Sequence, residues 1–200
     1  MCKADPARGK NEICAAILAG GTNTRMGQNK AMLQVNGIPL IQHIHSQLTA
    51  LFDTVVISAN DEKKFAFLSC DVIPDETPDQ GPLMAIYSVL RALGKPVFIV
   101  ATDIPEIPHS ILDSILNLAR EYPESQVVVP VTAKGDYEPL FALYRPELIP
   151  VIQPALSAGL RHIYGLFSRV PITRYTLKPR EILLNLNHPQ DYQRYIKSGI

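Results

Sequence analysis

The sequence predicts an α/β fold, a three-layer sandwich with a mostly parallel central sheet and helices on both faces. Short runs rich in β-branched residues alternate along the chain with longer segments whose apolar residues recur every three or four positions. Several of the short runs are apolar throughout, which is typical of strands buried on both faces of a parallel sheet. With 46% of its 200 residues hydrophobic, the chain can bury the core that such a sandwich needs.

Charge and composition argue against several classes of function. Lysine plus arginine and aspartate plus glutamate both number 19, so an anion site would have to be local, and we expect no nucleic-acid partner. No apolar run approaches the roughly 18 residues of a membrane span, and the first dozen residues lack the apolar centre of a signal peptide. The three cysteines show no CxxC spacing, and the five histidines form no ligand cluster. We therefore expect a cytoplasmic protein without a membrane partner.

The first predicted strand begins at Ile13 and ends at Leu18, where it opens into a glycine-rich loop. Residues 1–11, before it, are polar and are expected to be a flexible N-terminal extension. The glycines at 20 and 21 could form only a tight turn, but with Arg25 and Lys30 after them they favour a loop whose backbone approaches an anion. The loop fits neither GxxxxGK with a following Ser or Thr nor GxGxxG, which excludes a Walker P-loop and a dinucleotide fingerprint.

The elements after this loop are expected to alternate in type. Up to residue 131 we expect a turn at Asn36-Gly37, a helix over 40–53, a strand over 54–58, a short helix through Phe65 and Leu68, a short strand over 71–74, a helix over 83–93, a strand over 97–101, a helix over 111–119 and a strand over 127–131. Beyond it we expect a turn and a strand within 134–145, a helical stretch over 147–168 broken near Gly159, a strand over 170–175, and a last helix with Asn187 or His188 near its N-cap and Pro189 in its first turn.

Polar features follow four of the predicted strands. In a Rossmann-like sheet, ligands bind at the carboxyl ends of the parallel strands. The loop after Leu18, Asn60 after the second strand, Asp75 after the third and Asp103 after the fourth should therefore line one crevice. Each has a plainer interpretation: Asn60 could end its strand, Asp75 could belong to an ordinary acidic loop, and Asp103 could be a solvated residue before a proline turn.

Four motifs resemble those of the nucleotidyltransferases of the molybdenum cofactor. LAGGTNTRMGQNK resembles the family pattern LAGGxSxRMGxDK, DQGPLMAI resembles its GPLAGI segment, VATDIPEIP is similar to its CDxP segment, and NLNHPQDY resembles its NINTPEDL. Their order and spacing match the family over residues 13–195. The resemblance implies one nucleotidyltransferase domain over 12–200, with a nucleotide-binding part at 12–131 and an acceptor-binding part with the last helix at 132–200. Asn29 replaces the usual Asp of the pattern, His188 replaces a Thr and Thr102 replaces a Cys.

The resemblance also implies an activity and a set of site residues. The activity is transfer of GMP from GTP to molybdenum-molybdopterin, with release of pyrophosphate and formation of the guanine dinucleotide cofactor. The implied nucleotide or cofactor contacts are Leu18, Ala19, Gly20, Gly21, Lys30, Asn60, Asp75, Asp103, Asn185 and Asn187, with Asp103 as the ligand of Mg²⁺ and Arg25, Lys30 and Asp103 as catalytic residues. Asn185 and Asn187 could equally be turn and cap residues of the last helix.

Other functions stay open at this point. Family members that use CTP tend to carry Ala-Gly where this chain has Gly20-Gly21, which favours GTP. A cytidylyltransferase, a sugar-phosphate or phospholactate nucleotidyltransferase, and a catalytically silent nucleotide-binding protein are the alternatives. The choice of acceptor would depend on Glu138, Pro139 and residues 159–168. We expect a monomer that makes transient contact with proteins of molybdopterin delivery or molybdoenzyme maturation.

Overall fold

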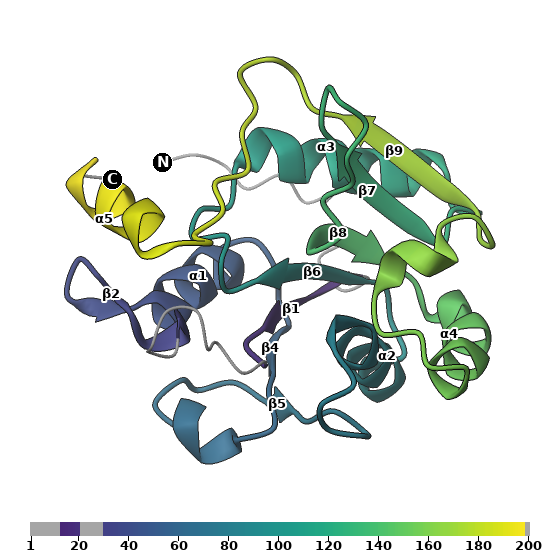
Figure 1. Cartoon of the computed structure of the whole chain (residues 1–200), viewed down its shortest axis with the longest axis horizontal. Coiled ribbons are helices and arrows are strands. Elements are labelled where there is room, and N and C mark those ends of the chain that lie inside the picture. The colour runs from purple at the N-terminus through teal and green to yellow at the C-terminus, as the bar shows by residue number, and fades with distance from the viewer. Residues whose placement is uncertain (1–12, 21–29, 199–200) are drawn as a thin grey trace.

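A seven-stranded sheet forms the centre of the molecule in the computed structural model, which describes residues 13–20 and 30–198 (Figure 1). The strands are β1 (Cys14–Leu18), β4 (Val55–Ser58), β5 (Val72–Ile73), β6 (Val97–Ala101), β7 (Val127–Val131), β8 (Phe141–Tyr144) and β9 (Ile172–Thr176). Their order is β5-β4-β1-β6-β8-β7-β9. Only β8 among them runs antiparallel to its neighbours, β6 and β7. The predicted mostly parallel sheet is therefore confirmed.

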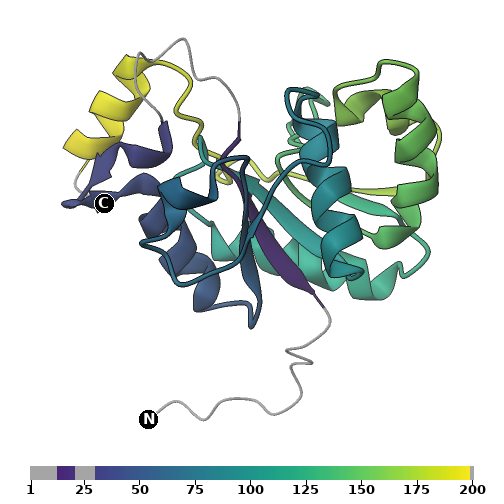
Figure 2. The same ribbon diagram turned by 90° about the horizontal axis from the view of Figure 1, so that it is seen from below.

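Helices cover both faces of this sheet (Figures 1 and 2). They are α1 (Leu40–Thr49), α2 (Pro82–Leu93), α3 (His109–Glu121), α4 (Ile149–Ser157) and α5 (Pro189–Lys197). Buried residues of α1, α3 and α5 belong to one hydrophobic core, and those of α2 and α4 belong to another. The three-layer sandwich predicted from the sequence is confirmed.

Strand β1 shows how the apolar runs produce the two cores. Side chains alternate between the faces of a strand. Ala15 and Ile17 pack into the core beneath α1 and α3, whereas Cys14, Ala16 and Leu18 pack into the core beneath α2 and α4. Because both faces are covered, the whole strand has to be apolar, and all five of its residues are buried.

The main local difference from the expected elements is that several expected helical segments form short 3-10 helices. The Asn36-Gly37 turn joins β2 (Gln34–Val35) to β3 (Ile38–Pro39), and both turn residues have the positive φ angles that such a hairpin turn requires. The segment after β4 forms only a 3-10 helix, η2 (Glu62–Phe65). Residues 147–168 contain α4 between two further 3-10 helices, η3 (Pro146–Leu148) and η4 (Ile163–Leu166). The expected break is present, because α4 ends at Ser157 and Gly159 has a φ of +90°.

The length and apolar character of the described helices fall short of what a membrane span requires. Within residues 13–20 and 30–198, no helix is both long enough and apolar enough to cross a bilayer. The expected N-terminal extension, residues 1–11, lies outside the described residues.

We predict that Gly81→Ala destabilises the protein much more than Gly135→Ala. Gly81 precedes α2 with φ +76° and ψ −176°, a region that almost only glycine occupies, and an added Cβ would meet the Arg161 carbonyl oxygen at 3.0 Å. Gly135 also has a positive φ, but its added Cβ would meet nothing within 4 Å. Denaturant unfolding should show a loss of about 2–4 kcal/mol for the first variant and about 1 kcal/mol for the second. Equal losses would show that the contact with Arg161 is not a constraint.

Candidate active site

The end of β1 lies between the two neighbouring strand ends that carry predicted site residues. The Ala19 N–H donates to the Ser58 carbonyl at 2.9 Å, and the Thr102 N–H donates to the Leu18 carbonyl at 3.3 Å. Gly20 is exposed, and among the described atoms a Cβ added to it would approach only the Ser58 carbonyl oxygen, at 4.0 Å. The described residues therefore leave the Gly20 backbone accessible to a ligand.

Asn60 and Asp75 are in direct contact at the ends of β4 and β5. The Asn60 Nδ2 donates to Asp75 Oδ2 at 3.1 Å, and the Asp75 backbone N–H donates to Asn60 Oδ1 at 2.8 Å. Partial burial raises the pKa of Asp75 against the opposing effect of the Asn60 hydrogen bond, and the charge of Asp79 adds to the rise. These bonds hold the Asp75 carboxylate in place and leave its other oxygen, Oδ1, without a hydrogen bond to another described residue.

Lys30 and Asp103 form the second pair of the site. Lys30 begins the 3-10 helix η1 (Lys30–Met32), and its side chain is only 11% exposed. Its Nζ lies 3.9 Å from Oδ2 of Asp103, which follows β6 and is 25% exposed. Burial raises the pKa of Asp103, and the charge of Lys30 opposes this rise. Since burying charged groups is costly, a lysine and a carboxylate held together at a strand end indicate a functional site.

The segment with the two predicted asparagines passes directly beside Asp103. The Leu186 N–H donates to the Asp103 carbonyl at 2.7 Å, and the Leu186 side chain is fully buried. Asn185 and Asn187 are the chain neighbours of Leu186, so their backbones lie close to that of Asp103. The Asn185 side chain donates to the Leu183 carbonyl at 3.4 Å, and α5 begins right after His188, where an N-cap was expected.

Glu138 extends the acidic surroundings of Asp103 toward the predicted acceptor-binding part. Glu138 is partly buried, and burial raises its pKa, followed by the charges of Asp103 and Asp136. The pKa of the half-exposed Tyr164 is raised by burial and then by Glu138 and Asp136. Glu138 is thus near enough to both Asp103 and Tyr164 for their charges to interact, and Tyr164 belongs to the 159–168 region expected to affect acceptor choice.

The donor set at Asp103 suits a hard divalent cation. Among the residues that the structure describes, no group of three or more His, Cys, Asp or Glu side chains is placed to hold a metal ion. Mg²⁺ does not require such a cage, because it keeps several waters and binds one or two carboxylates together with substrate phosphates. Asp103 offers one such carboxylate, and because its side chain is 25% exposed, a hydrated ion can reach it.

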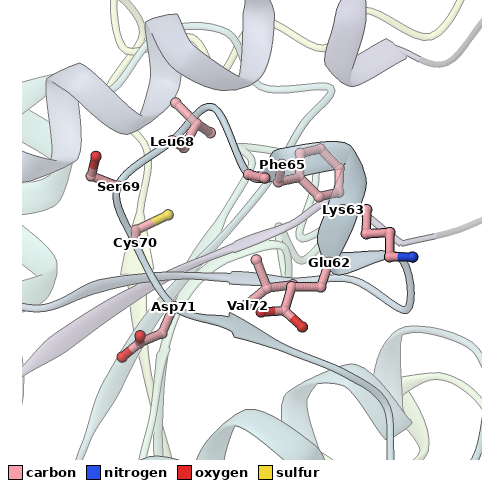
Figure 3. Close-up of a pocket in the computed structure, with 9 residues that line it drawn as sticks. Glu62, Lys63, Phe65, Leu68, Ser69, Cys70, Asp71 and Val72 are labelled. Atoms are coloured by element: carbon pink, nitrogen blue, oxygen red, sulfur yellow. The ribbon is translucent and has the colours of Figure 1, made fainter.

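A separate concavity of about 540 Å³ lies between η2 and β5 (Figure 3). It is lined by Glu62, Lys63, Phe65, Ala66, Leu68, Ser69, Cys70, Asp71 and Val72, and in Figure 3 the Cys70 sulfur points toward the middle of this ring. The described site residues predicted from the sequence are not part of its lining. Gly21 and Arg25 lie outside the described residues, as do Gly27 and Asn29 of the same loop.

One set of contacts near the site was missed by sequence reasoning. Glu106, three residues after Asp103, contacts His43 of α1 and Tyr195 of α5. The sequence had shown only that the five histidines form no ligand cluster. These partners are far apart in the sequence, so local spacing carries no signal of their contact.

Comparisons with known proteins find similar sequences and similar folds. Residues 15–171 match the MobA-like NTP transferase domain. The chain is 33% identical to a probable molybdenum cofactor guanylyltransferase of Carboxydothermus hydrogenoformans, over 92% of this chain and 95% of that protein. It resembles the crystal structure of molybdopterin-guanine dinucleotide biosynthesis protein A from Archaeoglobus fulgidus with a TM-score of 0.80 and 23% identity, covering 93% and 99% of the two chains.

A more distant structural neighbour contains a metal. It is a Mycobacterium tuberculosis protein solved in complex with manganese, with a TM-score of 0.66, 17% identity, and coverage of 94% and 99% of the two chains. At this identity the likeness concerns the fold alone. The domain match and the curated relative, by contrast, extend over most of the sequence, and this chain belongs to the MobA-like NTP transferase family.

Proposed function

We propose that this protein transfers GMP from GTP to molybdenum-molybdopterin, releases pyrophosphate and forms the molybdopterin guanine dinucleotide cofactor. The observation that carries the proposal is the pair formed by the buried Lys30 of η1 and the partly buried Asp103, which follows the carboxyl end of β6. The curated relative that covers nearly the whole chain is named for guanylyl transfer, which supports the choice of nucleotide and acceptor.

The reaction asks the protein for positioning and charge neutralisation. An oxygen of the acceptor's terminal phosphate attacks the α-phosphorus of GTP, a new P–O bond forms, and the bond to the β-phosphate bridging oxygen breaks with its electron pair leaving on pyrophosphate. Lys30, whose Nζ lies 3.9 Å from Asp103 Oδ2, is proposed to offset charge on the leaving group. The backbone at Gly20, which is open to solvent, can approach the phosphates, and Gly21 and Arg25 are proposed to complete that loop.

Asp103 is proposed to hold Mg²⁺, with Asn185 and Asn187 beside it. The bound ion would supply charge neutralisation for the phosphates of the nucleotide and the acceptor. The protein's own part is to fix the Asp103 carboxylate, through the Leu186 hydrogen bond to its backbone and the charge of Lys30.

We predict that Asp75→Asn weakens GTP binding about tenfold or more while changing CTP binding much less. The guanine ring presents two N–H donors side by side, which a carboxylate accepts, and charged hydrogen bonds contribute about 1.5–3 kcal/mol. The hydrogen bond from Asn60 Nδ2 to Asp75 Oδ2, 3.1 Å long, would hold the carboxylate in position for such a contact. Calorimetric titration with each nucleotide measures the difference.

Asp79→Asn is the matched control for this variant. Asp79 lies in the same loop with a φ of +61°, a conformation that asparagine also tolerates. Its GTP affinity should equal that of the wild type. An equal loss in both variants would assign the effect to loop charge instead of base contact.

A cytidylyltransferase is the second candidate, because the fold alone does not choose the base. The test is pyrophosphate release with molybdenum-loaded molybdopterin, Mg²⁺ and either GTP or CTP. GTP should support release and CTP should not, and release with CTP alone would reject the guanine assignment.

On the acceptor side, Glu138 and the 159–168 region are proposed to contact molybdopterin, because electrostatic interactions link them to Asp103. A cytoplasmic location and a monomeric state remain predictions.

A further inference from the structure

The loop that joins β6 to α3, residues 102–108, carries Asp103 and is here called the Asp103 loop. Its own turn is short, with the Ile104 N–H donating to the Ala101 carbonyl at 3.1 Å. Ile104 and Ile107 are both buried. Only Ile104 and Pro105 separate Asp103 from Glu106, and proline fixes its own φ angle. A displacement of Glu106 should therefore also displace Asp103, because only two residues, one of them proline, lie between them.

Helix α1 holds this loop with two side chains. Gln47 Nε2 donates to the Pro105 carbonyl at 2.9 Å, and Gln47 Oε1 accepts from the Ile107 N–H at 3.0 Å. His43 lies one turn earlier on the same helix face, and its Nε2 is 3.0 Å from Glu106 Oε1. The two α1 side chains thus fix the backbone on both sides of Glu106 and its carboxylate.

Helix α5 reaches the same carboxylate from the other end of the chain. The Tyr195 hydroxyl donates to Glu106 Oε1 and lies 3.3 Å from His43 Nε2. Burial raises the pKa of Tyr195, followed by the interaction with Glu106, so the phenol remains a donor. The residues just before α5 are bound to the Asp103 loop as well, through the hydrogen bond from Leu186 to the Asp103 carbonyl.

We propose that Glu106, His43 and Tyr195 are positioning residues, through which the docking of α5 fixes Asp103 and the neighbouring Asn185 to Asn187 segment. The proposal concerns the geometry of the Asp103 loop, and its link to magnesium rests on the proposed function. Helix α5 has a second attachment for comparison, because the Tyr192 hydroxyl donates to the Gln34 carbonyl of β2 at 2.7 Å. That bond holds the helix without touching the Asp103 loop.

The test compares Tyr195→Phe with Tyr192→Phe in the full-length protein. Each variant removes one hydroxyl from α5, but only the first removes a contact with Glu106. Hydrogen exchange followed by NMR should show the Leu186 and Ile107 amides exchanging about tenfold faster in Tyr195→Phe, the loss expected for one hydrogen bond to a charged group. In Tyr192→Phe these two amides should keep the wild-type rates.

Calorimetry of GTP binding at several Mg²⁺ concentrations gives the second measurement. The Mg²⁺ concentration for half-maximal GTP affinity should rise several-fold in Tyr195→Phe and in Glu106→Ala. In Tyr192→Phe this Mg²⁺ concentration should stay near the wild-type value. In Glu106→Gln it should be closer to the wild-type value than in Glu106→Ala, because the glutamine side-chain oxygen can still accept from Tyr195.

Two results would overturn the proposal. One is wild-type exchange of the Leu186 and Ile107 amides in Tyr195→Phe. The other is equal acceleration in both tyrosine variants, which would mean that the hydroxyls only help α5 to dock. Hydrogen exchange of the two tyrosine variants is measured without a substrate. If the wild type failed to transfer GMP, the proposed function would be rejected, but the exchange rates would still decide the positioning role.

Discussion

Asp103→Asn should lower the rate of GMP transfer about 100-fold or more without destabilising the fold. The rate falls because the variant removes the carboxylate proposed to hold the metal, and losing one such electrostatic group costs on the order of 10²–10³ in turnover. Turnover is measured as pyrophosphate release at saturating GTP over a range of Mg²⁺ concentrations. Asp113→Asn, on the exposed side of α3, is the matched control and should keep wild-type turnover.

The stability of the variant follows from the pKa of Asp103. Burial raises that pKa above its ordinary value in spite of the nearby Lys30. An acid with a raised pKa in the folded state lowers the free energy of unfolding as the pH rises from the unfolded pKa, about 3.9, through the folded pKa. At pH 7 the ionised Asp103 is therefore a net cost to folding, and a neutral asparagine should unfold at the same or a higher temperature. A large fall in unfolding temperature would contradict this account.

Lys30→Met should also lower turnover about 100-fold, and it should change the titration of Asp103. The variant removes the buried cation proposed to offset charge on pyrophosphate. Because the charge of Lys30 lowers the pKa of Asp103, its removal should raise that pKa further. NMR titration of the metal-free protein measures the pKa, and pyrophosphate release measures turnover.

Lys134→Met is the control for the lysine variant. Lys134 is exposed in the turn before β8, so its loss should change neither quantity. A Lys30→Met protein with wild-type turnover would remove Lys30 from the reaction. An unchanged Asp103 pKa would show that the two side chains do not interact at their 3.9 Å separation.

Much of the fold could be predicted because burial on two faces leaves a strong pattern. β1 and β6 are apolar at every position and buried at every position, so their place in the sheet interior was evident. The direction of β8 could not be predicted, because the apolar residues of Phe141–Tyr144 suit a parallel or an antiparallel neighbour equally well. The extent of α4 was also not evident. Pro150 and Pro154 stand among its apolar residues, and the helix ends at Ser157.

The candidate site was predictable to the extent that it follows strand ends. Asn60 and Asp75 were expected in one crevice, and their two hydrogen bonds bring them together. The rule about strand ends says nothing about which loop residue turns inward, so the contact between Lys30 and Asp103 came only from the structure. The contacts of Glu106 with His43 and Tyr195 join three distant segments, and such tertiary contacts leave no local pattern in one sequence.

The most direct test of guanylyl transfer follows the label of GTP into the acceptor. Wild-type protein and Asp103→Asn are each incubated with Mg²⁺, molybdenum-loaded molybdopterin and GTP labelled at either the α- or the γ-phosphate. We expect that α-label enters the dinucleotide product, that γ-label leaves with pyrophosphate, and that Asp103→Asn transfers about 100-fold less. This expectation would be contradicted by an acceptor that stays unlabelled with wild-type protein, or by equal transfer in both proteins.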